Sequence, residues 1–370
     1  MARILRANVP DYVFITAVAF LTMFGLVALA SASSELGKAK FDDTLFYIKH
    51  QLSSGLIIGM IGFCAAYLVP LAYFRKASIA LLLGTIVALV LVFTPLGFSA
   101  GGATRWLSIG GVTFQPAEIL KFTFVIYLAA WLSGDLRKRS SSLEGFIPFL
   151  ILCATVAALL IFQPTTSTVV IVLGAGMMMY FAGGGRVAFI AGAAVLGAVA
   201  LAALIALSPY RLARVMTYIN PTADLFGAGF QRNQALIALG SGGVFGVGYG
   251  NSVAKFNYLP EPLSDSIFAV IGEEFGFAGS LVLISMFLVL ITRMFSIAKQ
   301  TPDRFGKLVV IGVVGTVAIQ AFMNMGALSG FLPLTGVPLP FVSYGGTALA
   351  IVLTSMGLVA QISRYSTASA

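Results

Sequence analysis

A glutamate and a lysine stand one helical turn apart in a long apolar segment. Glu118 and Lys121 follow Pro116, which suits the first position of a helix, where its missing N–H costs nothing. Their i, i+3 spacing lets the charges neutralise each other, so one interpretation is an ion pair that fixes helix packing. Charged groups at membrane depth are costly and often functional, so the pair can also line a substrate cavity. The sequence leaves both interpretations open.

An aspartate stands where another long apolar segment begins. Asp265 follows the segment Pro260-Glu261-Pro262-Leu263-Ser264. One interpretation is structural, with Ser264 capping a helix and Asp265 complementing the helix dipole. The other is chemical, because a carboxylate at the mouth of a cavity can act as a general base or bind a cation.

Two adjacent carboxylates lie two turns beyond this aspartate. At about 100° per residue, Glu273 lies about 80° around the helix from Asp265, and Glu274 about 180°. Glu273 is therefore the one expected to share the Asp265 face. The two carboxylates cannot both face lipid, so they need a water-filled cavity, protonation or polar partners. A buried hydrogen-bonded pair that orients helices is the structural alternative.

Transmembrane helices must position these groups. Of the 370 residues, 59% are hydrophobic and 9% are charged, against about 25% charged in an average soluble domain. The apolar residues form blocks of about 20, which match the thickness of a bilayer. They do not alternate with polar residues as in a membrane β-barrel. We expect an all-α membrane protein that forms one domain over residues 1–370.

Ten spans are predicted, with a long connection before the eighth. That connection, residues 209–264, is far longer than usual and is expected to carry short amphipathic helices at the membrane surface. Residues 330–346 contain too many prolines and glycines for a continuous helix, so they are expected to re-enter the membrane or to form a corner. The predicted spans are 11–33, 51–70, 77–95, 116–134, 146–163, 167–184, 187–208, 265–292, 308–330 and 341–363.

The basic residues predict the orientation. With a cytoplasmic N terminus, 13 of the 22 lysines and arginines lie inside, 8 lie outside, and Lys121 lies within a span. Four of the outside eight belong to the long connection, where the positive-inside rule is weak. Both termini are therefore expected in the cytoplasm, and the net charge of +9 is attributed to this rule rather than to nucleic acid.

Other residues with distinctive chemistry form no recognised motif. Cys64 and Cys153 lie within apolar blocks and indicate neither a disulfide framework nor a metal cluster. The sole histidine, His50, is expected to face water at a membrane boundary. The glycine-rich residues 240–250 lack the strand and the acid of a dinucleotide site, so tight turns are expected there.

Several segments together resemble the SEDS family, whose members include FtsW, RodA and SpoVE. The pattern Gly-Asn-Ser-Val-x-Lys-x-x-Tyr-Leu-Pro-Glu that begins at Gly250 resembles the division branch, FtsW, more than the elongation branch, RodA. The matching stretches follow the family's order from the third span to the last: 102–107, 115–121, 210–215, 248–255, 258–274 and the run that ends at 346.

The resemblance implies a peptidoglycan glycosyltransferase that polymerises lipid II at the outer face of the bacterial cytoplasmic membrane, in septal wall synthesis. Asp265 occupies the position of the family's catalytic aspartate. It would deprotonate the acceptor sugar's 4-hydroxyl, or help a divalent cation (Mg²⁺ or Mn²⁺) to activate it. That oxygen would attack the anomeric carbon of the growing chain and expel undecaprenyl pyrophosphate. The implied partners are a class B penicillin-binding protein and other division proteins, and no organic cofactor is expected.

Further site residues are predicted around Asp265. Arg105, Arg211 and Arg214 are candidates for pyrophosphate contacts, because guanidinium groups suit such oxygens. Lipid-headgroup anchors or loop salt bridges are their alternative roles. The other candidates for the substrate cavity are Glu118, Lys121, Lys255, Glu261, Glu273 and Ser343.

The chain departs from the family pattern at two places. The family often reads His-Thr-Asp before the catalytic helix, whereas this chain reads Leu263-Ser264-Asp265. Many members read Gln-Pro-Asp after the fifth span, and here Thr165 replaces that acid, which weakens the metal hypothesis. The remaining alternatives are an elongation polymerase of the RodA type, a scaffold without activity, and a lipid II flippase. A flippase usually has paired repeats, and the sequence has no clear inverted repeat.

Overall fold

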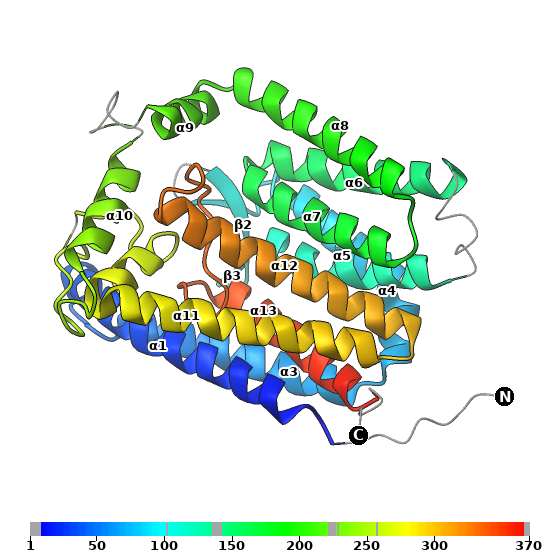
Figure 1. Cartoon of the computed structure of the whole chain (residues 1–370), viewed down its shortest axis with the longest axis horizontal. Helices are drawn as coiled ribbons and strands as arrows, with labels where there is room; N and C mark the ends of the chain where they lie inside the picture. Colours follow the sequence, from blue (N-terminus) through cyan, green and yellow to red (C-terminus); the bar gives the residue numbers. More distant parts are fainter. Residues whose placement is uncertain are drawn as a thin grey trace.

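The computed structural model describes residues 9–100, 103–134, 143–220, 227, 229–256 and 258–365. These residues form a bundle of long helices (Figure 1). Nine helices in these ranges are long and apolar enough to cross a membrane, and a shorter apolar helix adds a tenth. The ten helices lie where the ten spans are predicted. Arg3, Arg6 and residues 137–139 of the predicted basic side, and Gly102 of the motif, lie outside the described residues.

The ten apolar helices follow one another with short connections, except before α5, α11 and α13. Two short helices lie in the described residues of the long connection before α11: α9 (Pro209–Ile219), which is strongly amphipathic, and α10 (Phe230–Ser241). The prediction of short helices in residues 209–264 is confirmed, and their position at the membrane surface stays a prediction. The ten are α1 (Tyr12–Phe41), the continuous run of α2 (Phe46–His50), η1 (Gln51–Ile57) and α3 (Ile58–Leu68), then α4 (Leu71–Leu91), α5 (Pro116–Ser133), α6 (Leu143–Phe162), α7 (Thr166–Ala182), α8 (Val187–Ala206), α11 (Ile267–Gln300), α12 (Arg304–Leu328) and α13 (Gly346–Ser363).

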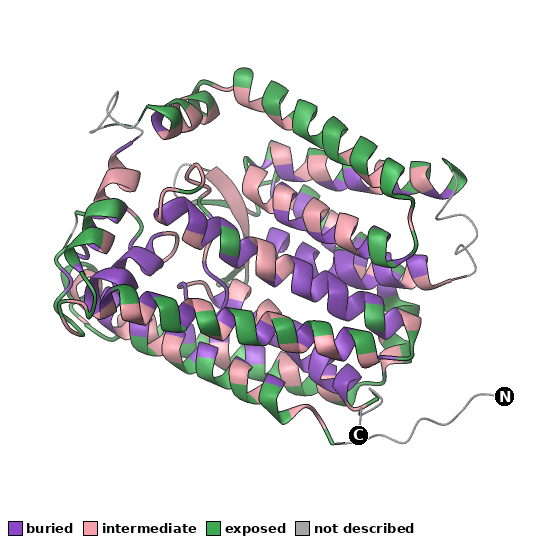
Figure 2. Cartoon of the chain, in the orientation of Figure 1, coloured by how far each residue is buried: buried purple, intermediate pink, exposed green. Residues whose placement is uncertain are grey.

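The centre of the bundle is built from α5, α12 and α13. About 72% of the most apolar stretch is buried in each of these three helices, whereas none is buried in α8. Figure 2 shows the same contrast, and Figure 1 shows α12 between α7 and α11. An apolar helix without buried residues needs an apolar solvent, so α8 is suited to face lipid.

A three-stranded antiparallel sheet, absent from the prediction, precedes α5. Its strands are β1 (Gly97–Ala100), β2 (Ala103–Ile109) and β3 (Val112–Phe114). Ile109 pairs with Val112, and Gly110 and Gly111 between them have φ values of 58° and 82°. Positive φ at both central residues is the type I′ hairpin geometry, which glycine adopts at little cost.

The glycine-rich segment after α10 docks against a break in α11. Gly276 has φ 67° and ψ −164°, so the helix is interrupted there. The main chain of the glycine-rich segment fills the break, and Gly248 N donates to Glu274 O at 3.0 Å. A Cβ on Gly246 would lie 2.1 Å from Glu274 O, so only glycine permits this approach. The predicted tight turns are confirmed, and close packing of two backbones is their cause.

The proline-rich run between α12 and α13 is not helical, as predicted. It extends from Ser329 to Gly345, so α13 begins five residues later than the predicted span. The second half of the run is buried in protein, with Leu339 and Val342 each 1% exposed, whereas Phe331 near its start is 76% exposed. Irregular backbone at membrane depth requires this kind of protein environment.

Candidate active site

A large open cavity of about 1920 Å³ lies among β2, the segment after α6, α9, the segment before α11 and the proline-rich run. Apolar residues of α7, α8 and α12 extend its wall. Seven of the predicted site residues line it: Arg105, Glu118, Lys121, Arg211, Arg214, Glu261 and Asp265.

Asp265 lies two residues before α11 rather than in its first turn. Ser266 is the N-cap residue and makes no side-chain capping bond. Ser264 Oγ donates instead to Glu261 Oε2 at 2.9 Å, so the prediction that Ser264 caps the helix is wrong. The main-chain oxygen of Asp265 accepts from Asn324 Nδ2 at 2.8 Å. Its carboxylate forms no ion pair or hydrogen bond with the described residues, which leaves both oxygens available to a ligand.

The surroundings make this carboxylate a stronger base than an ordinary aspartate. Burial raises the pKa of Asp265 to about 6, and the negative charge of Glu261 adds to the rise. The positive charges of Arg214 and Arg105 act in the opposite direction. At neutral pH the group is mainly ionised and still able to accept a proton.

Three arginines of the cavity are held by main-chain carbonyls. Arg105 Nη2 donates to Pro164 O at 2.8 Å, and Arg214 Nη1 donates to Leu334 O at 3.4 Å. Arg211 Nη1 lies 3.5 Å from a carbonyl of α8. None of the three pairs with an acidic residue in the described part of the chain, so the salt-bridge role is not observed. Guanidinium groups that are held in place but have no acidic partner can bind an anionic group such as a pyrophosphate.

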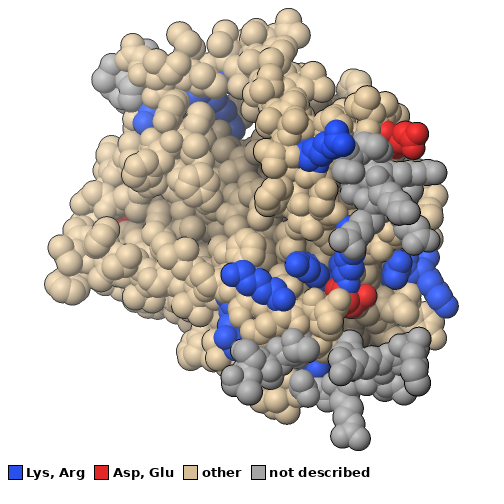
Figure 3. All heavy atoms as spheres, turned by 45° about the vertical axis from the view of Figure 1, so that its right-hand side comes forward, with Lys and Arg blue, Asp and Glu red and all other residues tan. Residues whose placement is uncertain are grey.

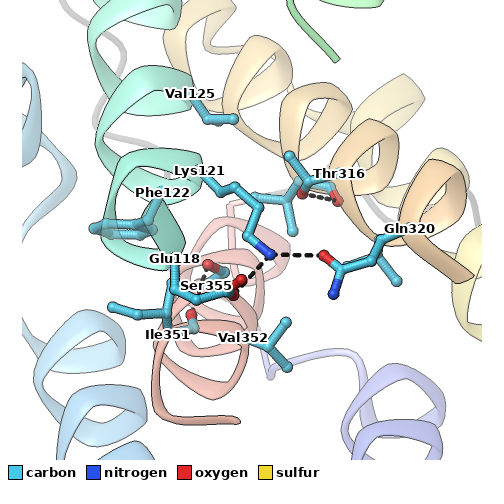
Figure 4. A pocket seen from close by; sticks show the side chains of 11 residues that line it. Glu118, Lys121, Phe122, Val125, Thr316, Gln320, Ile351, Val352 and Ser355 are labelled. Atoms are coloured by element: carbon cyan, nitrogen blue, oxygen red, sulfur yellow. Dashed lines mark hydrogen bonds and ion pairs between the residues drawn. The ribbon is translucent and has the colours of Figure 1, made fainter. Parts of the chain in front are cut away.

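Glu118 and Lys121 form the ion pair that their spacing predicts (Figure 4). Lys121 Nζ lies 2.7 Å from Glu118 Oε2 and donates to Gln320 Oε1 at 2.7 Å. Both charged side chains are buried, and a pocket of about 20 Å³ lies beside them, enough for about one water molecule. Both residues also line the large cavity, so the ion pair is confirmed and its role toward a substrate stays a prediction.

Breaking this pair is expected to destabilise the fold. Lys121→Met leaves Glu118 buried without its cation, and we expect the free energy of unfolding to fall by about 3 kcal/mol. Adding Glu118→Gln removes the stranded charge and should restore most of the loss. Titration with a denaturing detergent measures both variants. Equal stability of the single and double variants would contradict the prediction.

Glu273, Glu274 and Lys255 belong to a separate buried cluster outside the wall of the cavity. The Glu273 carboxylate accepts hydrogen bonds from Ser252 Oγ and from the main-chain N–H groups of Val253 and Ala254, in the loop between α10 and α11. Lys255 Nζ lies 3.2 Å from Glu274 Oε1. The expectation that Glu273 shares a face with Asp265, and that Lys255 contacts the cavity, is corrected. The loop folds back over α11 and satisfies these charges.

Ser343 also lies behind the cavity wall rather than in it. It is 6% exposed, accepts from Leu339 N at 2.7 Å and donates to Ser264 O. The next residue, Tyr344, donates its N–H to Leu263 O at 2.9 Å. These bonds tie the proline-rich run to the segment before Asp265, so the predicted cavity role of Ser343 is replaced by a structural one.

The sequence prediction missed several residues near the site. Gln320 and Asn324 lie one turn apart on α12 and bind the proline-rich run. Two amides at this spacing in an apolar span are a signal that could have found them. His50 is exposed, as predicted, but it lines the cavity, and its Nδ1 lies 2.9 Å from the Tyr344 hydroxyl.

A divalent cation stays a prediction. No group of three or more His, Cys, Asp or Glu side chains that could hold a metal occurs among the described residues. Mg²⁺ often keeps several waters and shares substrate phosphates instead of occupying a protein cage. Thr165, which replaces the family's second acid, lines the cavity. A cation here would therefore take most of its ligands from the substrate.

Comparison with known proteins identifies the relatives of this chain. A family model described as a cell cycle protein, FtsW/RodA/SpoVE, matches residues 11–368. Stage V sporulation protein E of Bacillus subtilis (strain 168) is 36% identical over 360 residues, covering 96% of this chain and 98% of that protein. The probable peptidoglycan glycosyltransferase FtsW of Geobacter sp. (strain M18) is 37% identical over 359 residues, covering 97% and 98%.

Solved structures share the fold. The rod shape determining protein RodA of Thermus thermophilus aligns with a TM-score of 0.68 and 25% identity, covering 96% of this chain and 97% of that one. A chain of a peptidoglycan synthase complex, solved for the structural coordination of polymerization and crosslinking, aligns with a TM-score of 0.78 and 25% identity, covering 96% and 98%. The resemblance drawn from the motifs is confirmed: this membrane protein belongs to the FtsW, RodA and SpoVE family, the SEDS family.

Proposed function

We propose that the chain is a peptidoglycan glycosyltransferase that polymerises lipid II. The observation that carries the proposal is the Asp265 carboxylate, which has no partner among the described residues and shares its cavity with three arginines that pair with no acidic side chain in the described part of the chain. A base and a set of fixed cations are what glycosyl transfer from a pyrophosphate donor requires. Relatives named as probable peptidoglycan glycosyltransferases support the same conclusion.

The groups of the cavity suit the two halves of the reaction. Asp265 takes the proton from the 4-hydroxyl of the acceptor sugar, and the oxygen forms a bond to the anomeric carbon of the growing chain. The bond from that carbon to the pyrophosphate breaks, and undecaprenyl pyrophosphate leaves with the electron pair. Arg105, Arg211 and Arg214 neutralise the charge that develops on the leaving group. The apolar wall from α7, α8 and α12 suits the polyprenyl chain.

The charge distribution supports a cytoplasmic position for both termini. Asp11 N donates to Ser363 Oγ at 3.1 Å, so the start of α1 and the end of α13 lie side by side. Figure 3 turns this side of the molecule forward, and lysines and arginines outnumber acidic residues on it. The positive-inside rule therefore supports our proposal that this face is cytoplasmic and that the cavity opens at the outer face of the membrane.

The partners follow from the proposed reaction. We propose a class B penicillin-binding protein as the crosslinking partner, because a structural neighbour belongs to a complex that couples polymerization to crosslinking. Relatives named FtsW support a role in septal wall synthesis together with other division proteins. Mg²⁺ or Mn²⁺ bound to the pyrophosphate is part of the proposal.

One assay separates the proposed polymerase from a flippase. The chain is purified with its cognate penicillin-binding protein and supplied with lipid II and Mg²⁺ or Mn²⁺, and the products are separated by size. Glycan polymer supports the proposal. Scrambling of labelled lipid II across liposomes without any polymer would replace it with transport.

The pH dependence of the rate tests the role of Asp265 as the base. Because its pKa is raised to about 6, the rate should rise with pH through about 6 and level off above it. Glu261→Gln removes a charge that raises this pKa, so the acidic limb should move to lower pH. Arg214→Gln removes a charge that lowers it, so the limb should move to higher pH. Initial rates at saturating lipid II, measured over a range of pH, give the pH at which the rate rises. The same value in wild type and in both variants would reject Asp265 as the base.

A further inference from the structure

Two amide side chains of α12 hold neighbouring carbonyls of the proline-rich run. Gln320 is 4% exposed and Asn324 is 2% exposed. Gln320 Nε2 donates to Pro338 O at 2.8 Å. Asn324 Nδ2 donates to Val337 O at 2.7 Å and also to Asp265 O at 2.8 Å. Of these two amides, Asn324 alone joins the run to the segment that carries the carboxylate.

Asn324 makes its hydrogen bonds at one junction, where Val337 of the proline-rich run meets Asp265. Both of its partners are main-chain carbonyls, which accept only, so the NH₂ group must face them. Its two N–H bonds are used there, and its Oδ1 has no hydrogen-bond partner among the described residues. Asn324 does not line the cavity. Its contribution is therefore to hold the main chains of Val337 and Asp265 together.

This junction lies beside both the carboxylate and an arginine of the cavity. Gly336, next to Val337, approaches both groups: a Cβ there would lie 3.3 Å from Asp265 Oδ2 and 3.8 Å from Arg214 Nη1. Leu334 O, two residues earlier, accepts from Arg214 Nη1. The run from 334 to 337 thus contacts the guanidinium group at one end and is joined to Asp265 through Asn324 at the other.

We propose that Asn324 is a positioning residue for Asp265, which fixes the carboxylate against the arginines that receive the leaving group. The inference rests on the proposed glycosyltransferase function for its catalytic meaning. The two hydrogen bonds act on the main chain, so their loss moves the carboxylate without removing it. A displacement of about 1 Å at a reacting group commonly costs about 100-fold in rate.

Gln361 on α13 provides a matched control. It is 4% exposed, its Nε2 donates to Tyr67 O at 3.1 Å and to Val69 O at 2.6 Å, and its Oε1 has no partner among the described residues. It lies near the end of α13 and outside the cavity wall. Asn324→Leu and Gln361→Leu therefore remove the same kind and number of bonds from two different places.

The kinetic experiment compares these variants in the complex with the penicillin-binding partner. Asn324→Leu should lower kcat about 100-fold with the KM for lipid II unchanged, whereas Gln361→Leu should stay within about twofold of wild type. Asn324→Asp keeps the shape but offers at most one O–H donor to the two carbonyls, so its kcat should also fall. A wild-type rate in Asn324→Asp, or losses in the two leucine variants that simply follow their thermal stability, would overturn the inference.

Hydrogen–deuterium exchange of the purified chain tests the junction without any activity. Asn324→Leu should speed exchange in residues 263–267 and 333–343, and Gln361→Leu should leave both segments as in wild type. Unchanged exchange in Asn324→Leu overturns the inference whether or not the chain makes polymer. A wild-type chain without polymer overturns the proposed function, and with it the catalytic meaning of Asn324, while the exchange result still decides whether the junction exists.

Discussion

Asp265→Asn is expected to lower the rate of lipid II polymerisation by about 1,000-fold, the middle of the range for loss of a general base. The amide has nearly the shape of the carboxylate but cannot accept the proton of the attacking hydroxyl. The carboxylate has no hydrogen-bond partner among the described residues, so no observed protein contact is lost. Product formation with purified partner and saturating lipid II measures the effect.

The same substitution should make the fold more stable. The folded chain keeps the proton on Asp265 up to about pH 6, whereas the ordinary pKa of an aspartate is 3.8. Stability therefore falls as the pH rises from about 4 to about 6, and the cost persists at neutral pH. Asparagine carries no charge and avoids this cost, so its unfolding midpoint at pH 7 should exceed that of wild type. Lost activity together with gained stability excludes misfolding as the cause.

Asp43→Asn is the matched control for this substitution. Asp43 lies in the connection after α1, and its Oδ2 is 2.7 Å from Lys49 Nζ. Asp43 does not line the cavity. Removing its carboxylate should leave the rate within about twofold of wild type, because an exposed pair contributes little. A rate for Asp265→Asn equal to that of Asp43→Asn would remove Asp265 from the mechanism.

Gly336→Ala is expected to lower the rate by about 100-fold, because the new methyl group would displace the Asp265 carboxylate, which we propose to be the base. The Cβ would lie 3.3 Å from Asp265 Oδ2, and φ at Gly336 is 63°, which alanine rarely adopts. The methyl group therefore pushes on the carboxylate while the backbone resists the substitution. Rate and unfolding midpoint are both measured, since two effects are combined.

Gly184→Ala separates these two effects. Gly184, between α7 and α8, has φ 95°, and its Cβ would have no atom within 4 Å. Alanine there should cost stability through backbone strain alone, by about 1 kcal/mol, and leave the rate nearly unchanged. If the two alanine variants lose activity equally, the contact between residue 336 and Asp265 has no special importance.

The fold was predictable to the extent that a bilayer imposes it. Apolar blocks of about 20 residues require spanning helices, so ten spans could be placed before any coordinates. The boundaries were less certain because the bilayer does not determine where capping occurs. α11, for instance, begins at Ile267 and continues to Gln300. The sheet before α5 was missed because its strands are only three to seven residues long, although Gly110-Gly111 is a hairpin signal.

The sequence predicted the site correctly for polar side chains that line the cavity and form no ion pair within the described residues. Asp265 and the three arginines line the cavity together, as the resemblance implied. Glu273 and Lys255 could not be separated from them by sequence, since a buried carboxylate looks alike whether a loop or a substrate satisfies it. The spacing of Gln320 and Asn324 could have drawn attention to Asn324, but not to its role, because its partners are backbone carbonyls, which every residue carries.

The isolation of α8 bears on how the protein is handled in vitro. α8 contributes Leu201 and Ile205 to the cavity wall, yet none of its residues is buried. Part of the reaction chamber is therefore bounded by whatever amphiphile surrounds the chain. Detergent, nanodisc or native lipid is then a component of the catalyst, and rates measured in different media compare different chambers.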